Sequence, residues 1–154
     1  MMKRGCRDGE LDVRGISHRG YFASITDFKS YHDANMDLID YKTATDLFHD
    51  NWPIYTRTNN SCPTHYFDTA NVSNSVISNG SMIEGTVENS IVGRGCTIKK
   101  GAVIKNCVVL ADCTIGENVH IENLVVDKHA KITHAKEIIR PADEPGYIKR
   151  NDTL

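Results

Sequence analysis

Three histidines in the second half of the chain, at positions 120, 129 and 134, are the residues best suited to acid–base chemistry. In an acyltransferase built from stacked repeats, a histidine acts as general base on a substrate bound between adjacent subunits. His120 alternates with Val119 and Ile121, which we expect to point inward, and His129 falls at a corner of the repeat described below. Both are therefore interpreted first as surface residues, and acyl transfer is the alternative function. A carboxylate orienting His120 or His134 at a subunit junction would favour it.

Four basic residues lie within two consecutive sides of the same repeat, where they could bind phosphate or another small anion. They are Arg94, Lys99, Lys100 and Lys105. A solvated basic face is the other interpretation of such a group. The pattern leaves two readings open, a contact site for a sugar-phosphate or other anionic effector and ordinary surface charge.

The cysteines and histidines do not have the spacing of metal ligands, so no metal site is predicted. The five cysteines are odd in number and lack a C-x-x-C motif, which is typical of reduced cytosolic thiols. Cys96 and Cys113 occupy equivalent positions in neighbouring repeats and could approach disulfide distance. We interpret them as two small buried core residues.

These side chains are positioned by a repeat in which asparagine is followed, two and three residues later, by a β-branched pair and, nine residues later, by isoleucine. Its four copies are Asn74–Ile83, Asn89–Ile98, Asn106–Ile115 and Asn123–Ile132. The asparagines step by 15, 17 and 17 residues, whereas a second column steps by 17 throughout. That second column is Val87, Ile104, Ile121 and Ile138. A period near 17 predicts three short sides per turn, as in a hexapeptide parallel β-helix.

Within each column, every residue must pack against its equivalent in the next coil, because equivalent residues of stacked coils lie about 4.8 Å apart. The isoleucine column can form an interior spine, and the column two residues before it is small (Ser81, Cys96, Cys113 and Ala130). The column before that, Gly80, Gly95, Asp112 and His129, holds mostly types that tolerate positive φ at a corner. The asparagines can bond one another in a ladder. An antiparallel sandwich would not keep these columns in register.

We therefore predict a mainly β protein: a left-handed parallel β-helix of about four coils over residues 72–139. The left hand is assigned because hexapeptide repeats are known for it. If Ile77, Val92, Val109 and Val126 point inward, their neighbours form an outward apolar stripe. That stripe is Val76, Ile91, Val108 and Val125. Four exposed β-branched residues favour burial against another copy, so a dimer or tetramer joined by this stripe is expected.

The remaining segments carry weaker signals. A helix is expected from about Ser30 to Tyr41, with Asp27 as N-cap. Residues 42–71 read as a linker lying across the open first coil, and residues 140–154 as a tail or capping strand. The net charge of −2, without a basic stripe or long apolar run, argues against nucleic acid or membrane as partner. No signal peptide is apparent, so a cytoplasmic location is expected.

Several segments together resemble the carboxy-terminal part of bacterial glucose-1-phosphate adenylyltransferase (ADP-glucose pyrophosphorylase). They are His18–Phe22, Tyr31–Leu38, Asn51–Thr56 and the hexapeptide block 72–139. The resemblance implies that residues 1–41 are the end of a nucleotidyltransferase domain, whose glycine-rich nucleotide loop does not occur in residues 1–20. It also implies an aspartate that helps hold the catalytic Mg²⁺, where this chain has Ser24. A hydroxyl is a poor substitute for that carboxylate.

The pattern is similar to the regulatory subunit type of this family in glycogen biosynthesis. The chain is therefore expected to be a C-terminal oligomerisation and regulatory domain, a fragment of a longer protein, inactive by itself and without a cofactor of its own. The expected partner is another copy or a catalytic subunit of the same family. The runner-up is a hexapeptide acyltransferase-like domain.

Overall fold

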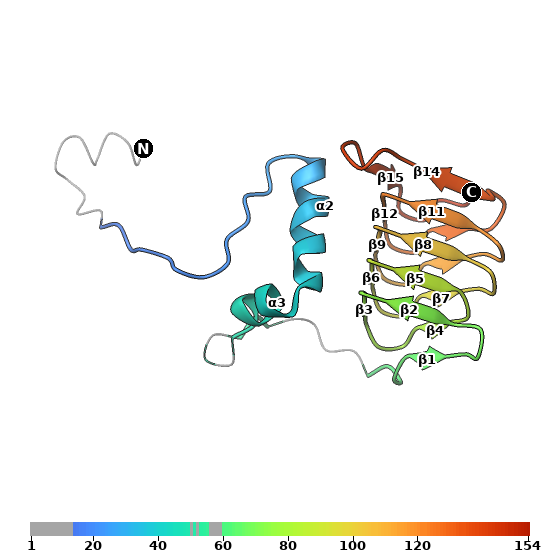
Figure 1. Cartoon of the computed structure of the whole chain (residues 1–154), viewed down its shortest axis with the longest axis horizontal. Helices are drawn as coiled ribbons and strands as arrows, with labels where there is room; N and C mark the ends of the chain where they lie inside the picture. Colours follow the sequence, from blue (N-terminus) through green and yellow to red (C-terminus); the bar gives the residue numbers. More distant parts are fainter. Residues whose placement is uncertain (1–13, 50, 52, 56–59) are drawn as a thin grey trace.

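The chain is a parallel β-helix with helices along one side, as the computed structural model shows (Figure 1). The structure describes residues 14–49, 51, 53–55 and 60–154. Its strands form three parallel five-stranded sheets. Sheet A contains β1 (His65–Tyr66), β4 (Met82–Ile83), β7 (Thr97–Ile98), β10 (Thr114–Ile115) and β13 (Lys131–Ile132). Sheet B contains β2 (Asn71–Ser73), β5 (Thr86–Glu88), β8 (Val103–Lys105), β11 (His120–Glu122) and β14 (Glu137–Ile139). Sheet C contains β3 (Val76–Ile77), β6 (Ile91–Val92), β9 (Val108–Val109), β12 (Leu124–Val126) and β15 (Gly146–Ile148).

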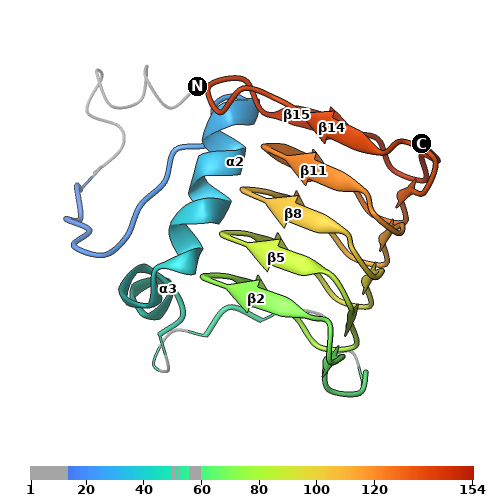
Figure 2. The same cartoon turned by 45° about the vertical axis from the view of Figure 1, so that its right-hand side comes forward.

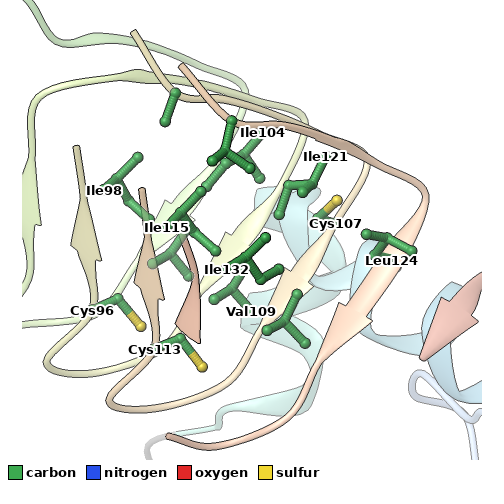
Figure 3. Packing of buried hydrophobic residues seen from close by; sticks show 14 of the residues in the cluster. Cys96, Ile98, Ile104, Cys107, Val109, Cys113, Ile115, Ile121, Leu124 and Ile132 are labelled. Carbon is green, nitrogen blue, oxygen red and sulfur yellow. The ribbon is translucent and has the colours of Figure 1, made fainter. Parts of the chain in front are cut away.

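The predicted columns are the registers of these sheets. Ile98 pairs with Ile83 on one side and Ile115 on the other, and Ile115 pairs with Ile132. All four isoleucines are fully buried, and Figure 3 shows three of them in line inside the coil. The four repeats correspond to about four turns, as predicted, and β1, β2 and β15 extend the sheets beyond residues 72–139.

The corners have the backbone that the sequence predicts. The first corner column has φ of 81° at Gly80, 67° at Gly95, 61° at Asp112 and 62° at His129. The asparagine column is also left-handed, with φ of 42° at Asn74, 45° at Asn89, 50° at Asn106 and 55° at Asn123. Nδ2 of Asn74 donates to Oδ1 of Asn89 over 2.8 Å, and Nδ2 of Asn89 donates to Oδ1 of Asn106 over 2.7 Å. The asparagine ladder is therefore confirmed for Asn74, Asn89 and Asn106, whereas Nδ2 of Asn123 donates to the Arg140 carbonyl oxygen over 2.6 Å.

One corner explains the single step of 15 residues. β4 and β5 are joined by Glu84 and Gly85 alone, whereas the equivalent corner of the next coil runs from Lys99 to Ala102. A Cβ on Gly85 would lie 2.5 Å from the carbonyl oxygen of Ala102 and 2.8 Å from that of Lys99. The short corner therefore requires glycine because it passes directly beneath the longer one.

Helix α2 (Phe28–Met36) begins where the sequence predicts but ends earlier. The Asp27 side chain accepts from the Ser30 backbone N–H over 2.7 Å, and Ser30 Oγ accepts from the Asp27 N–H over 3.0 Å, which makes a capping box. A 3₁₀ turn, Asp37–Ile39, follows. Asp40 then caps a separate helix, α3 (Tyr41–Leu47). The expected single helix to Tyr41 is therefore divided into α2, the 3₁₀ turn and the start of α3, because the Asp40 cap starts a new helix.

The prediction for residues 42–71 as a linker lying across the first coil is wrong in its described part. That part contains most of α3, and β1 and the start of β2 are themselves the first coil. Residues 1–13 and Trp52 lie outside the described residues. At the opposite end, β15 pairs with β12, and Thr153 bridges to Lys131, so part of residues 140–154 pairs with the last coil. No helix in the described ranges is long and apolar enough to cross a membrane.

Helix α2 runs alongside sheet C, as both views show (Figures 1 and 2). Val108 and Val125 are each only 1% exposed, yet they do not belong to the interior cluster that contains Val109 and Val126. They point outward, as predicted. The expectation that they are exposed is wrong, because α2 covers this part of sheet C. In the same stripe Val76 is 43% exposed.

Candidate functional site

The contact between α2 and sheet C is anchored at two points. His32 is buried on the inner side of the helix, and its Nε2 lies 2.9 Å from the carbonyl oxygen of Asn106, a member of the asparagine ladder. At the first residue of the helix, the ring of Phe28 meets that of Tyr147 edge-on, with centroids 5.7 Å apart. Tyr147 pairs in register with Val125, so the helix spans β9, β12 and β15. The helix is therefore part of the β-helix unit rather than a free appendage.

The outer side of the same helix is apolar and open to solvent. An extended segment before the helix carries Phe22, which is 79% exposed, and Ile25, which is 58% exposed. Together with α2 and α3 it lines a cavity of about 480 Å³. The lining is mostly hydrophobic: Tyr21, Phe22, Ala23, Ile25, Tyr31, Ala34, Asn35, Leu38 and Leu47. We call this surface, made by residues 21–25, α2 and α3, the helix platform.

The extended segment is tied to the helices by a polar contact. The Tyr21 hydroxyl donates to Oδ2 of Asp37 over 3.0 Å. Partial burial and then this hydrogen bond raise the pKa of the Tyr21 phenol, so the phenol stays protonated as a donor at neutral pH. Ser24 lies between Phe22 and Ile25 on the platform and is exposed. A hydroxyl there provides no fixed negative charge for a cation.

The four basic residues of the predicted anion site lie at three different places on the coil. Arg94 precedes Gly95 in the corner between β6 and β7, Lys99 and Lys100 share the corner between β7 and β8, and Lys105 ends β8. Nζ of Lys99 lies 3.9 Å from Oε1 of Glu84, and Nζ of Lys105 lies 3.2 Å from Oε2 of Glu88. An anion would therefore meet two adjacent lysines, one of them already paired with a carboxylate.

The three candidate histidines also lie apart. His120 lies on the outer face of sheet B, and its side chain is 33% exposed. Its Nε2 lies 3.8 Å from Oε2 of Glu122, and its Nδ1 lies 3.5 Å from Oε1 of Glu137. His129 occupies the corner column, where its Nδ1 lies 3.6 Å from Oδ2 of Asp112. His134 is exposed near the end of the coil, and its backbone N–H donates to the Leu154 oxygen over 2.7 Å. Only His120 has carboxylates on both sides, which the sequence did not single out.

The cysteines within the coil are core residues, as expected. Cys96, Cys107 and Cys113 are buried and free, and Cys96 and Cys113 lie one above the other in Figure 3. The hydrogen bond with the Cys113 thiol and then burial raise the pKa of Cys96 far above its usual range. Burial raises the pKa of Cys107 to about 12. No group of three potential metal ligands occurs among the described residues.

The comparisons with known proteins agree with this architecture. Residues 63–144 match the family described as GlmU-like, C-terminal hexapeptide. Over 86 residues, 56% of this chain and 22% of the relative, the chain is 42% identical to a glucose-1-phosphate adenylyltransferase of Geobacillus stearothermophilus. It is 36% identical to the glycogen biosynthesis protein GlgD of Bacillus subtilis (strain 168) over 140 residues, 91% of this chain and 41% of the relative. A glucose-1-phosphate adenylyltransferase of Bacillus mycoides is 36% identical over 122 residues, 79% of this chain and 32% of that protein. The chain spans less than half the length of these relatives.

Proposed function

Because the chain belongs to the GlmU-like C-terminal hexapeptide family, we propose that it is the C-terminal oligomerisation and regulatory domain of a glucose-1-phosphate adenylyltransferase-like protein of glycogen biosynthesis. By itself it has no catalytic role. The region that resembles the catalytic motif of that family carries Ser24, whose neutral hydroxyl cannot offset the charge of a Mg²⁺ ion. Its partner is a catalytic domain or subunit of the same family.

The observation that carries this proposal is that α2 has a contact on each of its two sides. On the inner side, buried Val108 and the contact between His32 and the Asn106 carbonyl hold α2 on sheet C. On the outer side, the helix platform exposes Phe22 and Ile25 around the 480 Å³ cavity. An exposed apolar surface of this kind marks a contact with another domain or subunit. A displacement or a change of charge at that contact would act directly on the β-helix, since α2 contacts both the partner and sheet C.

The test uses the full-length adenylyltransferase of Geobacillus stearothermophilus as catalytic probe. The chain should co-elute with this enzyme and change its rate of Mg²⁺-dependent ADP-glucose synthesis, whereas the chain alone should show no synthesis. Phe22→Asp or Ile25→Asp should abolish the binding. Ile139→Asp, at a residue of β14 that is 47% exposed and outside the platform, is the matched control and should bind normally. Synthesis by the chain alone, or binding unaffected by both platform variants, contradicts the proposal.

An anionic effector, such as a sugar phosphate, is proposed to bind at the corner that carries Lys99 and Lys100. Support for this rests on two adjacent cationic side chains on one exposed turn. Lys100→Gln should then weaken the response of the complex to the effector without changing its basal rate, because Lys100 lies outside the platform. An unchanged effector response argues against this corner.

A second function is favoured by one observation, the position of His120 between Glu122 and Glu137. A carboxylate that orients a histidine is the arrangement that acyl transfer uses. Acyl transfer from an acyl-thioester donor to an amine or hydroxyl, lost in His120→Ala, would support this alternative. If the intact oligomer shows no acyl-transfer turnover, this alternative function is excluded.

A further inference from the structure

Two of the buried thiols in the β-helix are direct neighbours. Cys96 and Cys113 come immediately before Thr97 and Thr114, which pair in register between β7 and β10. The Thr97 N–H donates to the Cys113 backbone oxygen over 2.9 Å, so the two cysteines occupy equivalent positions in adjacent coils. Figure 3 shows both side chains pointing the same way. The fold therefore places two free thiols side by side.

The Cys96 thiol is directed toward the coil that carries Cys113. Its Sγ lies 3.1 Å from the carbonyl oxygen of Leu110, which belongs to that coil. The Cys96 thiol also forms a hydrogen bond with the Cys113 thiol, and this bond lowers the pKa of Cys113. A thiolate, rather than a thiol, is the form of cysteine that reacts with an oxidant. Cys113 is therefore the more reactive of the two, and Cys96 is placed to react with it.

The spacing of the coils allows a bond between the two sulfur atoms but does not favour a permanent one. In a disulfide the Cα atoms lie about 4.4–6.8 Å apart and the Cβ atoms about 3.5–4.5 Å apart. Stacked coils with parallel side chains keep both pairs of atoms about 4.8 Å apart, which meets the first requirement and exceeds the second. Oxidation must therefore draw the coils together by at least about 0.3 Å at this column. Strain of this kind makes a disulfide easier to reduce, so a bond between Cys96 and Cys113 is a reversible one.

Both thiols lie one residue inside a solvent-exposed corner. Gly95 precedes Cys96 and Asp112 precedes Cys113, and both corner residues are exposed. A small molecule at the corner is therefore separated from either sulfur by a single residue of chain. Because both cysteines are themselves buried, this position suits a small oxidant such as a hydroperoxide better than a bulky disulfide or a protein.

Cys107 shows what the pairing of thiols adds. It is equally buried, but its equivalents in the two adjacent coils are Ser90 and Leu124, which cannot form a disulfide. The Ser90 hydroxyl accepts from the Cys107 N–H over 3.0 Å. Burial raises the pKa of Cys107 to about 12, whereas the pKa of Cys113 is lowered. The chain therefore contains its own control, a buried thiol with no cysteine beside it.

We propose that Cys96 and Cys113 are a redox site, in which a hydroperoxide converts the two thiols into a disulfide between adjacent coils. The Cys113 sulfur attacks one oxygen of the peroxide, the O–O bond breaks, and Cys113 becomes a sulfenic acid while water or an alcohol leaves. The Cys96 sulfur then attacks the Cys113 sulfur. The S–O bond breaks, the S–S bond forms, and the Cys96 proton leaves with the oxygen as water. Two thiols are oxidised and one peroxide is reduced.

This redox site goes beyond the proposed function and does not depend on it. The two cysteines lie at the start of β7 and β10 in sheet A, whereas the helix platform lies against sheet C. In the oxidised chain the coils of β7 and β10 are joined covalently as well as by backbone hydrogen bonds. A dithiol reductant reverses the reaction by thiol–disulfide exchange.

The test uses the full chain with Cys6→Ser and Cys62→Ser, which leaves Cys96, Cys107 and Cys113 as its thiols. Hydrogen peroxide is added to the folded chain and removed, and the chain is then unfolded in urea and labelled with a maleimide. Two of the three thiols should be lost, and the mass before labelling should fall by two hydrogen atoms. The circular dichroism spectrum should not change, which shows that the bond forms in the folded chain.

Peptide mapping assigns the bond without altering either cysteine of the pair. Trypsin cuts after Lys99, Lys100 and Lys105 and so separates Cys96 from Cys113. With Cys107→Ser added, the only linked peptides should be those that contain Cys96 and Cys113. Cys107→Ser repeats the serine that the neighbouring coil already has at this position, so the variant should fold and oxidise normally.

Two further variants copy residues that already stand in the thiol column. Cys96→Ser repeats Ser81, whose Oγ lies 3.1 Å from the Gly93 oxygen, and Cys113→Ala repeats Ala130. Neither variant should form the disulfide. In Cys96→Ser the reaction should stop at the first step, so that a reagent specific for sulfenic acids labels Cys113 after peroxide treatment.

The proposal predicts a disulfide that forms in the folded chain and opens again with dithiothreitol, without urea. Three thiols that all survive peroxide until the chain unfolds would overturn it. So would a disulfide that includes Cys107, a loss of two thiols that persists in Cys96→Ser, or a bond that dithiothreitol cannot reduce in the folded chain.

Discussion

Replacing Ile115 by alanine tests whether the β-helix is stabilised as a linear stack. Ile115 is fully buried in the middle of sheet A, with Ile98 and Ile132 directly above and below it, both fully buried. The substitution removes three carbons, which costs about 2.4 kcal/mol at about 0.8 kcal/mol per buried CH₂. A cavity cost is added because the backbone on either side is bonded to both neighbours: the Thr97 N–H donates to the Cys113 oxygen over 2.9 Å, and the Thr114 N–H to the Ala130 oxygen over 3.0 Å. The expected loss therefore lies in the upper part of the usual range of about 2–5 kcal/mol.

Ile83→Ala is the matched variant, since the same group is removed from the same column near the first coil. On one side Ile83 faces Tyr66, which is half exposed and can move into the gap. The loss of unfolding free energy should therefore be smaller than at Ile115. Urea unfolding followed by circular dichroism measures both, and an unchanged m-value shows that only stability has changed. Equal losses at Ile83 and Ile115 would refute the reasoning, because a linear stack relaxes more easily at its open end.

Three further outcomes follow from the contacts described above. Val108→Lys should unfold or strongly destabilise the chain in urea, because it places an unpaired charge beneath α2, whereas Val76→Lys should leave it folded. Asp27→Ala should reduce helical circular dichroism. Hydrogen bonds from Ser30 lower the pKa of Asp27, so the stabilising effect of its carboxylate is present above the unfolded-state pKa and is lost as the pH falls through the lower folded-state pKa. A helical signal of the unmodified chain that does not change under acid would contradict this. Burial raises the pKa of Cys107 to about 12, so a thiol reagent at pH 8 should modify Cys62 quickly and Cys107 only after unfolding, and equal rates would contradict the buried position.

The middle of the β-helix could be predicted in detail because each of its residues contacts its own equivalent in the next coil. Self-contact forces the same type to recur, so the isoleucine column and the asparagine ladder were visible in the sequence, whereas the positive φ of the asparagines was not predicted. The first coil does not obey that constraint on its open side. Tyr66 takes the place of an isoleucine there, and the two-residue strand β1 has no pattern of its own. Its position follows only from pairing with β4.

The helix side of the molecule was harder to predict because its signals are local and short. The Asp27 cap was recognised, whereas the Asp40 cap four residues after Met36 was not, and α3 was therefore missed. The outward stripe was placed on the correct face of the strands, since Val109 and Val126 are in the core. What covers the stripe depends on a contact between α2 and residues far along the chain. Hydrophobic periodicity indicates that a surface needs a partner, and it does not say whether that partner is the same chain.

The two-residue corner at Glu84 and Gly85 shows that the length of chain in one coil and the rise of the β-helix are independent. The strands before and after the short corner still pair in register with the next coil, Ile83 with Ile98 and Val87 with Ile104. Rise is set by strand pairing, and any surplus chain is displaced sideways at a corner. Evolution can therefore lengthen or shorten a corner without moving any other coil, provided that a glycine is present where the chain is tightest. For an engineer, the turn from Lys99 to Ala102 is accordingly a natural position at which to insert a foreign loop.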